Sequence, residues 1–167
     1  MSDAEAALFE RIRRLGGDDD FQALLDSIPY SRFLGIRGER RGNELTFVLP
    51  FAEHLVGNPR LPALHGGVIG AFLETAAIIQ LVWESDSSVL PKTIDVAIDY
   101  LRSGRPRDTY ARATITKHGR RVANVRAEAW QDDRHRPIAA IHGHFLLRPR
   151  AVPDRNTPPP AASPSSR

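Results

Sequence analysis

Cysteine is absent from the 167 residues of this chain. The absence excludes thiol catalysis, disulfide bonds and thiolate metal sites, so any nucleophile must come from another residue type. A chain of this length is expected to form one main domain and to bury a hydrophobic core without disulfides or metal ions.

A secretory signal is also missing, because residues 1–17 carry acidic side chains from the third position onward. The apolar run from Val68 to Trp83 is short for a membrane span, and Glu74, Thr75 and Gln80 interrupt it. We therefore expect a cytoplasmic protein that does not insert into a membrane, and we interpret this run as a buried helix.

The positive charge is modest, with a formal net value of +3. Residues 148–167 contain four arginines and one aspartate, which accounts for this excess. The chain has no basic and aromatic pattern typical of nucleic-acid binding, so we expect no nucleic-acid partner. The net charge of residues 29–147 is also positive, which favours an anionic ligand.

The N-terminal part predicts helices followed by a hairpin. Residues 3–14 and 18–28 are predicted to form short amphipathic helices, with Pro29 closing the second. Apolar residues then alternate over 33–49 around a turn at 42–43, which predicts a β-hairpin.

The remaining segments predict one long helix and four further strands. The apolar run that contains Glu74 gives the helix, and period-two alternation with good turn residues gives antiparallel strands. The predicted strands cover residues 93–101, 110–118, 122–130 and 138–147. The Pro/Ser-rich end of the chain is predicted to be disordered. The expected division is an N-terminal helical segment, a central domain and a tail, at residues 1–29, 30–148 and 149–167.

This order of elements indicates an α+β fold. A helix that is apolar on all sides must be covered on all sides, so the antiparallel sheet is expected to curve around it. The N-terminal helices are expected to cover one end of the domain.

Glu74 is the most informative residue, because it places a carboxylate within an almost wholly apolar helix. Such a group is costly to bury unless it is paired or serves chemistry. Gly66 and Gly67 stand at the start of the same helix, where free N–H groups and the helix dipole can stabilise a developing negative charge. His65 and Asn58 lie just upstream on a Pro-rich loop and can add hydrogen bonds to this site.

Gly66 and Glu74 are eight residues apart, which is roughly 12 Å along one helix. A reacting carbonyl must lie about 3 Å from both the oxyanion donor and the nucleophile or base. If both groups act in one reaction, the glycine of one subunit must face the carboxylate of another. We therefore predict a homodimer with antiparallel helices and two composite sites.

The chain resembles the hotdog-fold acyl-CoA thioesterases of the phenylacetate-pathway type over about residues 30–147. The residues that carry this resemblance are Asn58, the trio His65-Gly66-Gly67, Glu74 with Thr75 and Ala76, and the segments IDYLRSGRP and GRR at 98–106 and 119–121.

The resemblance implies a curved sheet around one helix, a dimer that can pair again into a tetramer, hydrolysis of acyl-CoA thioesters, and no metal or redox cofactor. It implies that Glu74 activates water or attacks the thioester carbonyl, and that the Gly66 N–H polarises that carbonyl from the opposite subunit. Asn58 would help to position water or the carbonyl, although its loop has one residue more than in many relatives. One branch has a hydroxyl residue where this chain has Ile78, which leaves Thr75 as the nearby hydroxyl.

The candidate catalytic residues are thus Glu74 and Gly66, and the candidate substrate-binding residues are Asn58, His65, Gly67 and Thr75. Two other functions stay open: an acyl-CoA-sensing module without turnover, and a hydratase or dehydratase of acyl thioesters that uses His65 with Glu74.

Two strand histidines and two arginine clusters could bind a ligand, or could simply be exposed to solvent. His142 and His144 share one face of a strand, but no third ligand has fitting spacing, so no metal site is predicted. Arginines at 102, 105 and 107, or at 120 and 121, are either solvated or contact the phosphates of CoA.

Overall fold

The computed structural model describes residues 20–42, 44–84 and 90–147. The predicted helix 3–14 and the predicted tail 149–167 lie outside the described residues. The division of the chain at these two ends therefore stays a prediction.

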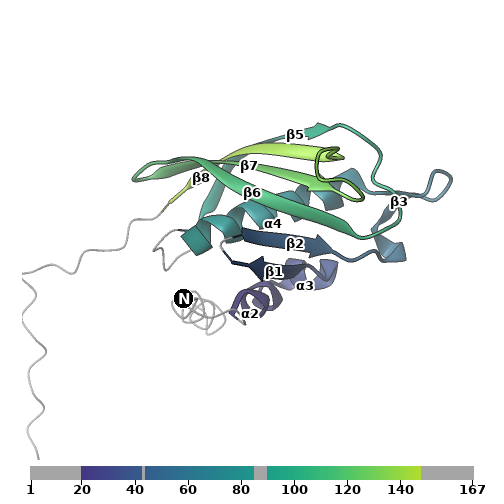
Figure 1. The fold of residues 1–167 in the computed structure, drawn as a ribbon, viewed down its shortest axis with the longest axis horizontal. Coiled ribbons are helices and arrows are strands. Elements are labelled where there is room, and N and C mark those ends of the chain that lie inside the picture. The colour runs from purple at the N-terminus through teal and green to yellow at the C-terminus, as the bar shows by residue number, and fades with distance from the viewer. Residues whose placement is uncertain (1–19, 43, 85–89, 148–167) are drawn as a thin grey trace, which may run out of the picture.

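Within the described residues, six antiparallel strands form the main sheet in the order β1-β2-β6-β7-β8-β5. The sheet bends around one long helix, so that β5 and β8 lie on one side of the helix and β1 and β2 on the other (Figure 1). The elements are β1 (Arg37–Arg41), β2 (Glu44–Leu49), α4 (Gly66–Glu84), β5 (Lys92–Tyr100), β6 (Thr109–His118), β7 (Val122–Trp130) and β8 (Ala139–Leu146). The predicted α+β architecture, with its hairpin, central helix and four later strands, is confirmed.

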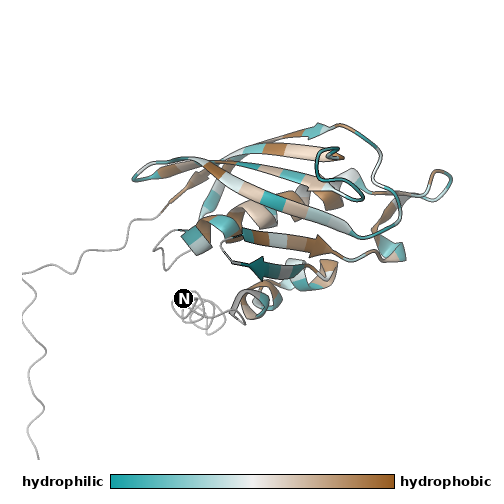
Figure 2. Ribbon diagram, in the orientation of Figure 1, coloured by the Kyte–Doolittle hydropathy of each residue, from teal (hydrophilic) through white to brown (hydrophobic). Residues whose placement is uncertain are grey.

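Alanine dominates the inner face of the central strands. The buried alanines on this face are Ala111, Ala113, Ala123, Ala127, Ala129 and Ala139. Because these side chains are small, α4 can pack close to the sheet and bury large residues such as Phe72 and Leu73. Hydrophobic residues accordingly line α4 and β2, whereas β1 at the margin is hydrophilic (Figure 2).

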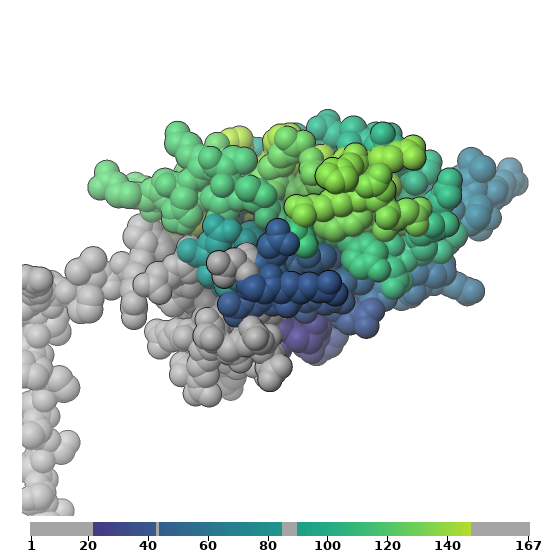
Figure 3. Space-filling view, viewed as in Figure 1, coloured from purple at the N-terminus to yellow at the C-terminus, as the bar shows by residue number. Residues whose placement is uncertain are grey.

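Within the described residues, α4 is the one helix with the length and hydropathy of a membrane span. It is the core helix of the domain, since Ile69, Leu81 and Val82 on different sides of it are all buried. In the view of Figure 3, β6, β7 and the turn between β7 and β8 cover most of it. The interpretation of this run as a buried helix is confirmed.

Two short helices, α2 (Asp20–Ser27) and α3 (Pro29–Leu34), precede the sheet. The prediction that Pro29 closes a helix is correct for α2 but incomplete, because Pro29 also occupies the first turn of α3. Proline is favoured there, since the first helical N–H needs no partner within the helix. The predicted start of the hairpin at residue 33 is wrong, because α3 continues until Gly35, whose φ of 69° ends the helix in the left-handed conformation.

The loop before α4 contains two short paired strands, β3 (Val56–Asn58) and β4 (Ala63–Leu64), which the sequence did not predict. A short 3-10 helix, η1 (Glu53–Leu55), leads into them. A Cβ atom at Gly57 would lie 2.8 Å from the backbone Cα of His65, so only glycine lets the two segments approach this closely.

Strand β5 forms an open edge of the sheet. Val96, Ile98 and Tyr100 point to the helix side, because they pair with inward-facing residues of β8. Ile94 lies in a register shift between Thr93 and Asp95. Large apolar side chains on this edge remain exposed, with Ile94 at 54% and Tyr100 at 55%.

Candidate active site between α4 and the edge strand

One face of α4 lies along β5 and carries the predicted site. Gly66, Gly70 and Glu74 follow one another at intervals of four residues and therefore share this face. Gly70 packs tightly there, since an added Cβ would lie 2.7 Å from Cδ1 of Ile98. Gly66 and Glu74 thus lie near opposite ends of the same edge strand.

Glu74 is half-buried and is held by a strand residue. The Thr93 hydroxyl donates a hydrogen bond of 2.6 Å to Oε1 of Glu74. Within the described part of the chain, Oε2 of Glu74 accepts no hydrogen bond, so one carboxylate oxygen is oriented and the other is available. The sequence suggested a fully buried carboxylate, but in the single chain the open edge of β5 leaves it partly exposed.

Thr93 is the residue that the sequence reasoning missed. Its hydroxyl fixes the carboxylate on the side of the helix that faces the sheet edge. No spacing rule connects a residue at the start of a strand to one in the preceding helix, so the contact depends on the tertiary arrangement. Period-two alternation places Thr93 on the face opposite Val96, and only the register shift between Thr93 and Asp95 turns its side chain to the helix side, so the sequence carried no signal for this contact.

The Gly66 amide is a free donor at the start of α4. Among the described residues it donates to no acceptor. The carbonyl of the same peptide unit, that of His65, accepts hydrogen bonds from Val68 N at 3.0 Å and Ile69 N at 3.2 Å. These two bonds polarise the peptide unit and make its N–H a better donor.

Gly67 and His65 bind each other. The Gly67 amide donates a hydrogen bond of 3.0 Å to Nδ1 of His65. Because Nδ1 accepts this bond, the hydrogen of the neutral imidazole is at Nε2. The His65 backbone is anchored by a bond of 2.8 Å from its amide to the Leu55 carbonyl. Of the two glycines, Gly66 therefore has the available N–H.

A family comparison and one related protein now place the chain. The model of the thioesterase superfamily matches residues 61–138. A medium/long-chain acyl-CoA thioesterase of Escherichia coli, YigI, is 31% identical over 121 residues, which cover 64% of this chain and 77% of the relative. The chain belongs to the thioesterase superfamily.

Solved structures agree with this assignment. A protein from Chromobacterium violaceum is 42% identical, with 88% of this thioesterase and 98% of that chain covered and a TM-score of 0.66. A phenylacetic acid degradation-related protein from Ralstonia eutropha is 19% identical, covers 84% of this chain and 99% of its own, and has a TM-score of 0.66, which supports the fold alone. The domain is a hotdog fold, and the chain is a thioester hydrolase, as the sequence resemblance implied.

Two predicted binding residues of this thioesterase are engaged elsewhere. Oδ1 of Asn58 accepts a hydrogen bond of 3.0 Å from the Arg60 amide and holds its own loop in a turn. The Thr75 hydroxyl donates to the Ala71 carbonyl at 2.8 Å, one helical turn back. Neither side chain is hydrogen-bonded to Glu74, although the Nδ2 group of Asn58 stays free to donate within the described residues.

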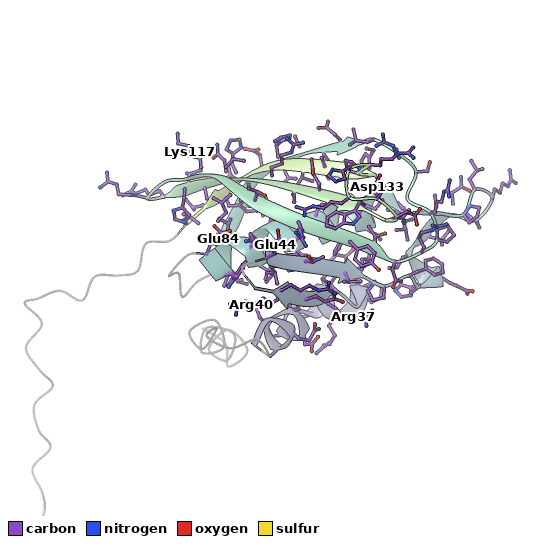
Figure 4. The ribbon with its side chains drawn as sticks, in the orientation of Figure 1. Arg37, Arg40, Glu44, Glu84, Lys117 and Asp133 are labelled. Atoms are coloured by element: carbon purple, nitrogen blue, oxygen red, sulfur yellow. The ribbon has the colours of Figure 1, made fainter. Side chains whose placement is uncertain are left out.

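A cavity opens beside Gly66, and a second one adjoins it. The first has a volume of about 390 Å³ and is lined by Gly66, Ile69, Tyr100 and residues 101–104. The second, of about 360 Å³, shares Arg102 and Ser103 with it and extends to the turn between β7 and β8, which Asp133 marks in Figure 4. The remaining charged residues of its lining are Arg105, Asp132 and Arg136.

The two strand histidines of this thioesterase lie on the outer face of the sheet. His142 and His144 are exposed, and Nδ1 of His144 is 2.9 Å from Oδ1 of Asp95. In the part of the chain that the structure describes, no group of three or more His, Cys, Asp or Glu side chains could hold a metal ion.

Proposed function

We propose that this chain hydrolyses an acyl-CoA thioester to the free acid and CoA, with Glu74 as the catalytic carboxylate and the Gly66 amide as the oxyanion donor. The observation that supports this most is the pairing of α4 with β5. One end of the pair carries a carboxylate fixed by Thr93, and the other carries an unpaired, polarised N–H. The acyl-CoA substrate of the related YigI supports the choice of thioester.

In the proposed reaction, Glu74 takes a proton from water while the water oxygen bonds to the thioester carbon, or its carboxylate attacks that carbon itself. The carbonyl oxygen becomes an oxyanion, which the Gly66 N–H stabilises. The intermediate collapses as the C–S bond breaks. In the general-base route, the CoA sulfur takes the proton that Glu74 received from water, and the acid is released. After direct attack, the CoA thiolate leaves and is protonated by water, and a second water hydrolyses the mixed anhydride to the free acid and the Glu74 carboxylate. Because a carboxylate, water and an N–H donor are sufficient, the proposal requires no metal or redox cofactor.

The proposed site is composite, with contributions from two copies of the chain. Gly66 lies at the Tyr100 end of β5 and Glu74 at the Thr93 end. When two β5 edges pair antiparallel about a two-fold axis, the Tyr100 end of one strand faces the Thr93 end of the other. This arrangement brings Gly66 of one copy towards Glu74 of the second copy. It would also cover the exposed apolar side chains of β5.

The arginine-lined cavity supports CoA as the leaving group. Arg102 is anchored by a bond of 2.6 Å from its guanidinium to the Pro137 carbonyl. The guanidinium groups of Arg105 and Arg136 have no partner among the described residues and remain available for phosphates. We propose that the phosphates of CoA bind in this cavity, while the thioester lies beside Gly66.

Thiol release from a panel of short, long and aromatic acyl-CoAs tests the proposal. The wild type is expected to release CoA, and Glu74→Gln is expected to lose at least a hundredfold in kcat while the protein stays folded. Glu84→Gln, at the far end of α4, is the matched control and should retain activity. Full activity in Glu74→Gln would reject the assignment.

Two further measurements use the same protein. Acyl-pantetheine, which lacks the nucleotide phosphates, should show a higher KM than the matching acyl-CoA. Enoyl-CoA should not be hydrated. A protein that binds acyl-CoA without turnover would instead be a sensor, and measurable hydration would indicate a hydratase.

A further inference from the structure

Tyr100 contacts the start of α4 from the last position of β5. Its hydroxyl donates a hydrogen bond of 2.8 Å to the Gly66 carbonyl. Its ring lies directly on Gly66, because a Cβ atom there would be 3.2 Å from the ring carbon Cζ. The side chain faces the helix side of the sheet, since Tyr100 pairs with the buried Ala139.

This hydrogen bond belongs to a chain that ends at His65. The Gly66 carbonyl shares a peptide unit with the Gly67 amide, which donates to Nδ1 of His65. Tyr100, the peptide unit and the imidazole therefore form consecutive hydrogen bonds, and each bond polarises the next. The Gly66–Gly67 peptide plane is therefore held at its carbonyl by Tyr100 and at its N–H by His65.

The two glycines give this second restraint a role beside the hydrogen bonds that the Val68 and Ile69 amides donate to the His65 carbonyl. Glycine has more backbone freedom than any other residue, and two of them begin the helix where the oxyanion donor must point in one direction. A rotation of the Gly66 backbone would turn its N–H away from the substrate carbonyl. A hydroxyl on a neighbouring strand fixes this direction without placing a side chain at residue 66.

We propose that Tyr100 is a positioning residue for the Gly66 amide, and that it acts through the Gly66–Gly67 peptide unit. This inference rests on the proposed function of Gly66. Its effect appears in the rate of the chemical step, because the oxyanion forms after the substrate has bound. Other contacts join β5 to α4 independently, such as the Thr93–Glu74 hydrogen bond.

Tyr100→Phe tests the proposal, since it keeps the ring and removes the hydroxyl. We expect kcat to fall roughly tenfold and KM to change less than twofold, because the Gly66 backbone is then restrained on one side only, by the bonds to the His65 carbonyl, and its N–H points less uniformly at the oxyanion. Tyr110→Phe is the matched control. Its ring stacks on Trp130, on the outer face of the sheet, and the variant should behave as wild type.

The amide resonances of Gly66 and Gly67 supply a second measurement. Both are expected to shift in Tyr100→Phe and to stay in place in Tyr110→Phe. A wild-type kcat in Tyr100→Phe would overturn the inference. A lower kcat with unchanged glycine resonances would also overturn it. Tyr100 would then only join β5 to α4, without orienting the peptide units of the two glycines. Either of these Tyr100→Phe results leaves the proposed function intact, provided that the wild type hydrolyses acyl-CoA and Glu74→Gln is inactive. A wild type that hydrolyses no acyl-CoA rejects the proposed function itself.

Discussion

At the residue scale, the sequence identified the two groups that face β5 but not the side chains that hold them. Glu74 and Gly66 could be predicted because an acid in an apolar helix and glycines at a helix start are local signals. Thr93 and Tyr100 come from a strand whose position relative to α4 no local pattern defines. The roles of all the predicted site residues, Glu74 and Gly66 included, stay predictions.

Removal of the Thr93 hydroxyl should weaken the orientation of Glu74. Thr93→Val has nearly the same shape, and we expect about a tenfold lower kcat with KM little changed, since a hydrogen bond to a charged group is lost. Thr114→Val, on the exposed outer side of β6, serves as control. Steady-state thiol release measures both variants, and an unchanged kcat in Thr93→Val would contradict the role of the hydroxyl.

At the scale of elements, the prediction succeeded where the pattern was long and periodic. The strands from β5 to β8 and the helix α4 each extend over eight or more residues, which gives a clear period. The pair β3–β4 and the helix α3 are too short for such a signal. The pair β3–β4 is nevertheless important for the site, because these strands lead into His65 at the start of α4.

Gly57→Ala tests this support. The added Cβ would meet the His65 backbone at 2.8 Å, and backbone cannot move as easily as the end of a side chain. We expect a loss of about 1–3 kcal/mol in the free energy of unfolding together with a lower kcat. Thermal unfolding and thiol release measure the two effects.

The control for this variant is Gly119→Ala, in the turn between β6 and β7. Its Cβ would meet the Val122 carbonyl oxygen at 2.8 Å, far from His65 in the chain. It should lower stability and leave kcat unchanged. If both variants keep the wild-type kcat, the contact between Gly57 and His65 has no role in the reaction.

At the scale of the whole molecule, the sequence predicted the architecture correctly, while the homodimer, its possible pairing into a tetramer and the cytoplasmic location stay predictions. The dimer could be inferred only from the distance along the helix: Gly66 and Glu74 are eight residues apart, too far for one carbonyl to contact both. Because α4 is one continuous helix, Gly66 and Glu74 of a single copy stay this far apart. The unpaired edge of β5 is where a second copy could pair and bring its Glu74 to this Gly66.

Complementation between two inactive variants tests the composite site. Gly66→Pro removes the N–H at a helix position that accepts proline, and Glu74→Gln removes the carboxylate. Each variant alone should be inactive. Mixed dimers, isolated after co-expression with two affinity tags, contain one intact site and should regain about half the wild-type activity per dimer.

Gly66→Ala is the control for the proline variant. It places the same Cβ against Tyr100 but keeps the amide N–H, so it should retain more activity than Gly66→Pro. Mixed dimers as inactive as their parents would show that each chain contains a whole site.

The alanine-lined inner face has a consequence for the fatty tail of a substrate. Where small residues seat α4 directly on the central strands, closely packed buried side chains fill the space under the middle of the helix. If the substrate carries a long acyl tail, that tail would therefore run beside the helix, at the seam where the two β5 edges meet in the proposed dimer. Chain-length preference would then be decided by the few side chains at that seam, and could change in evolution without repacking the interior.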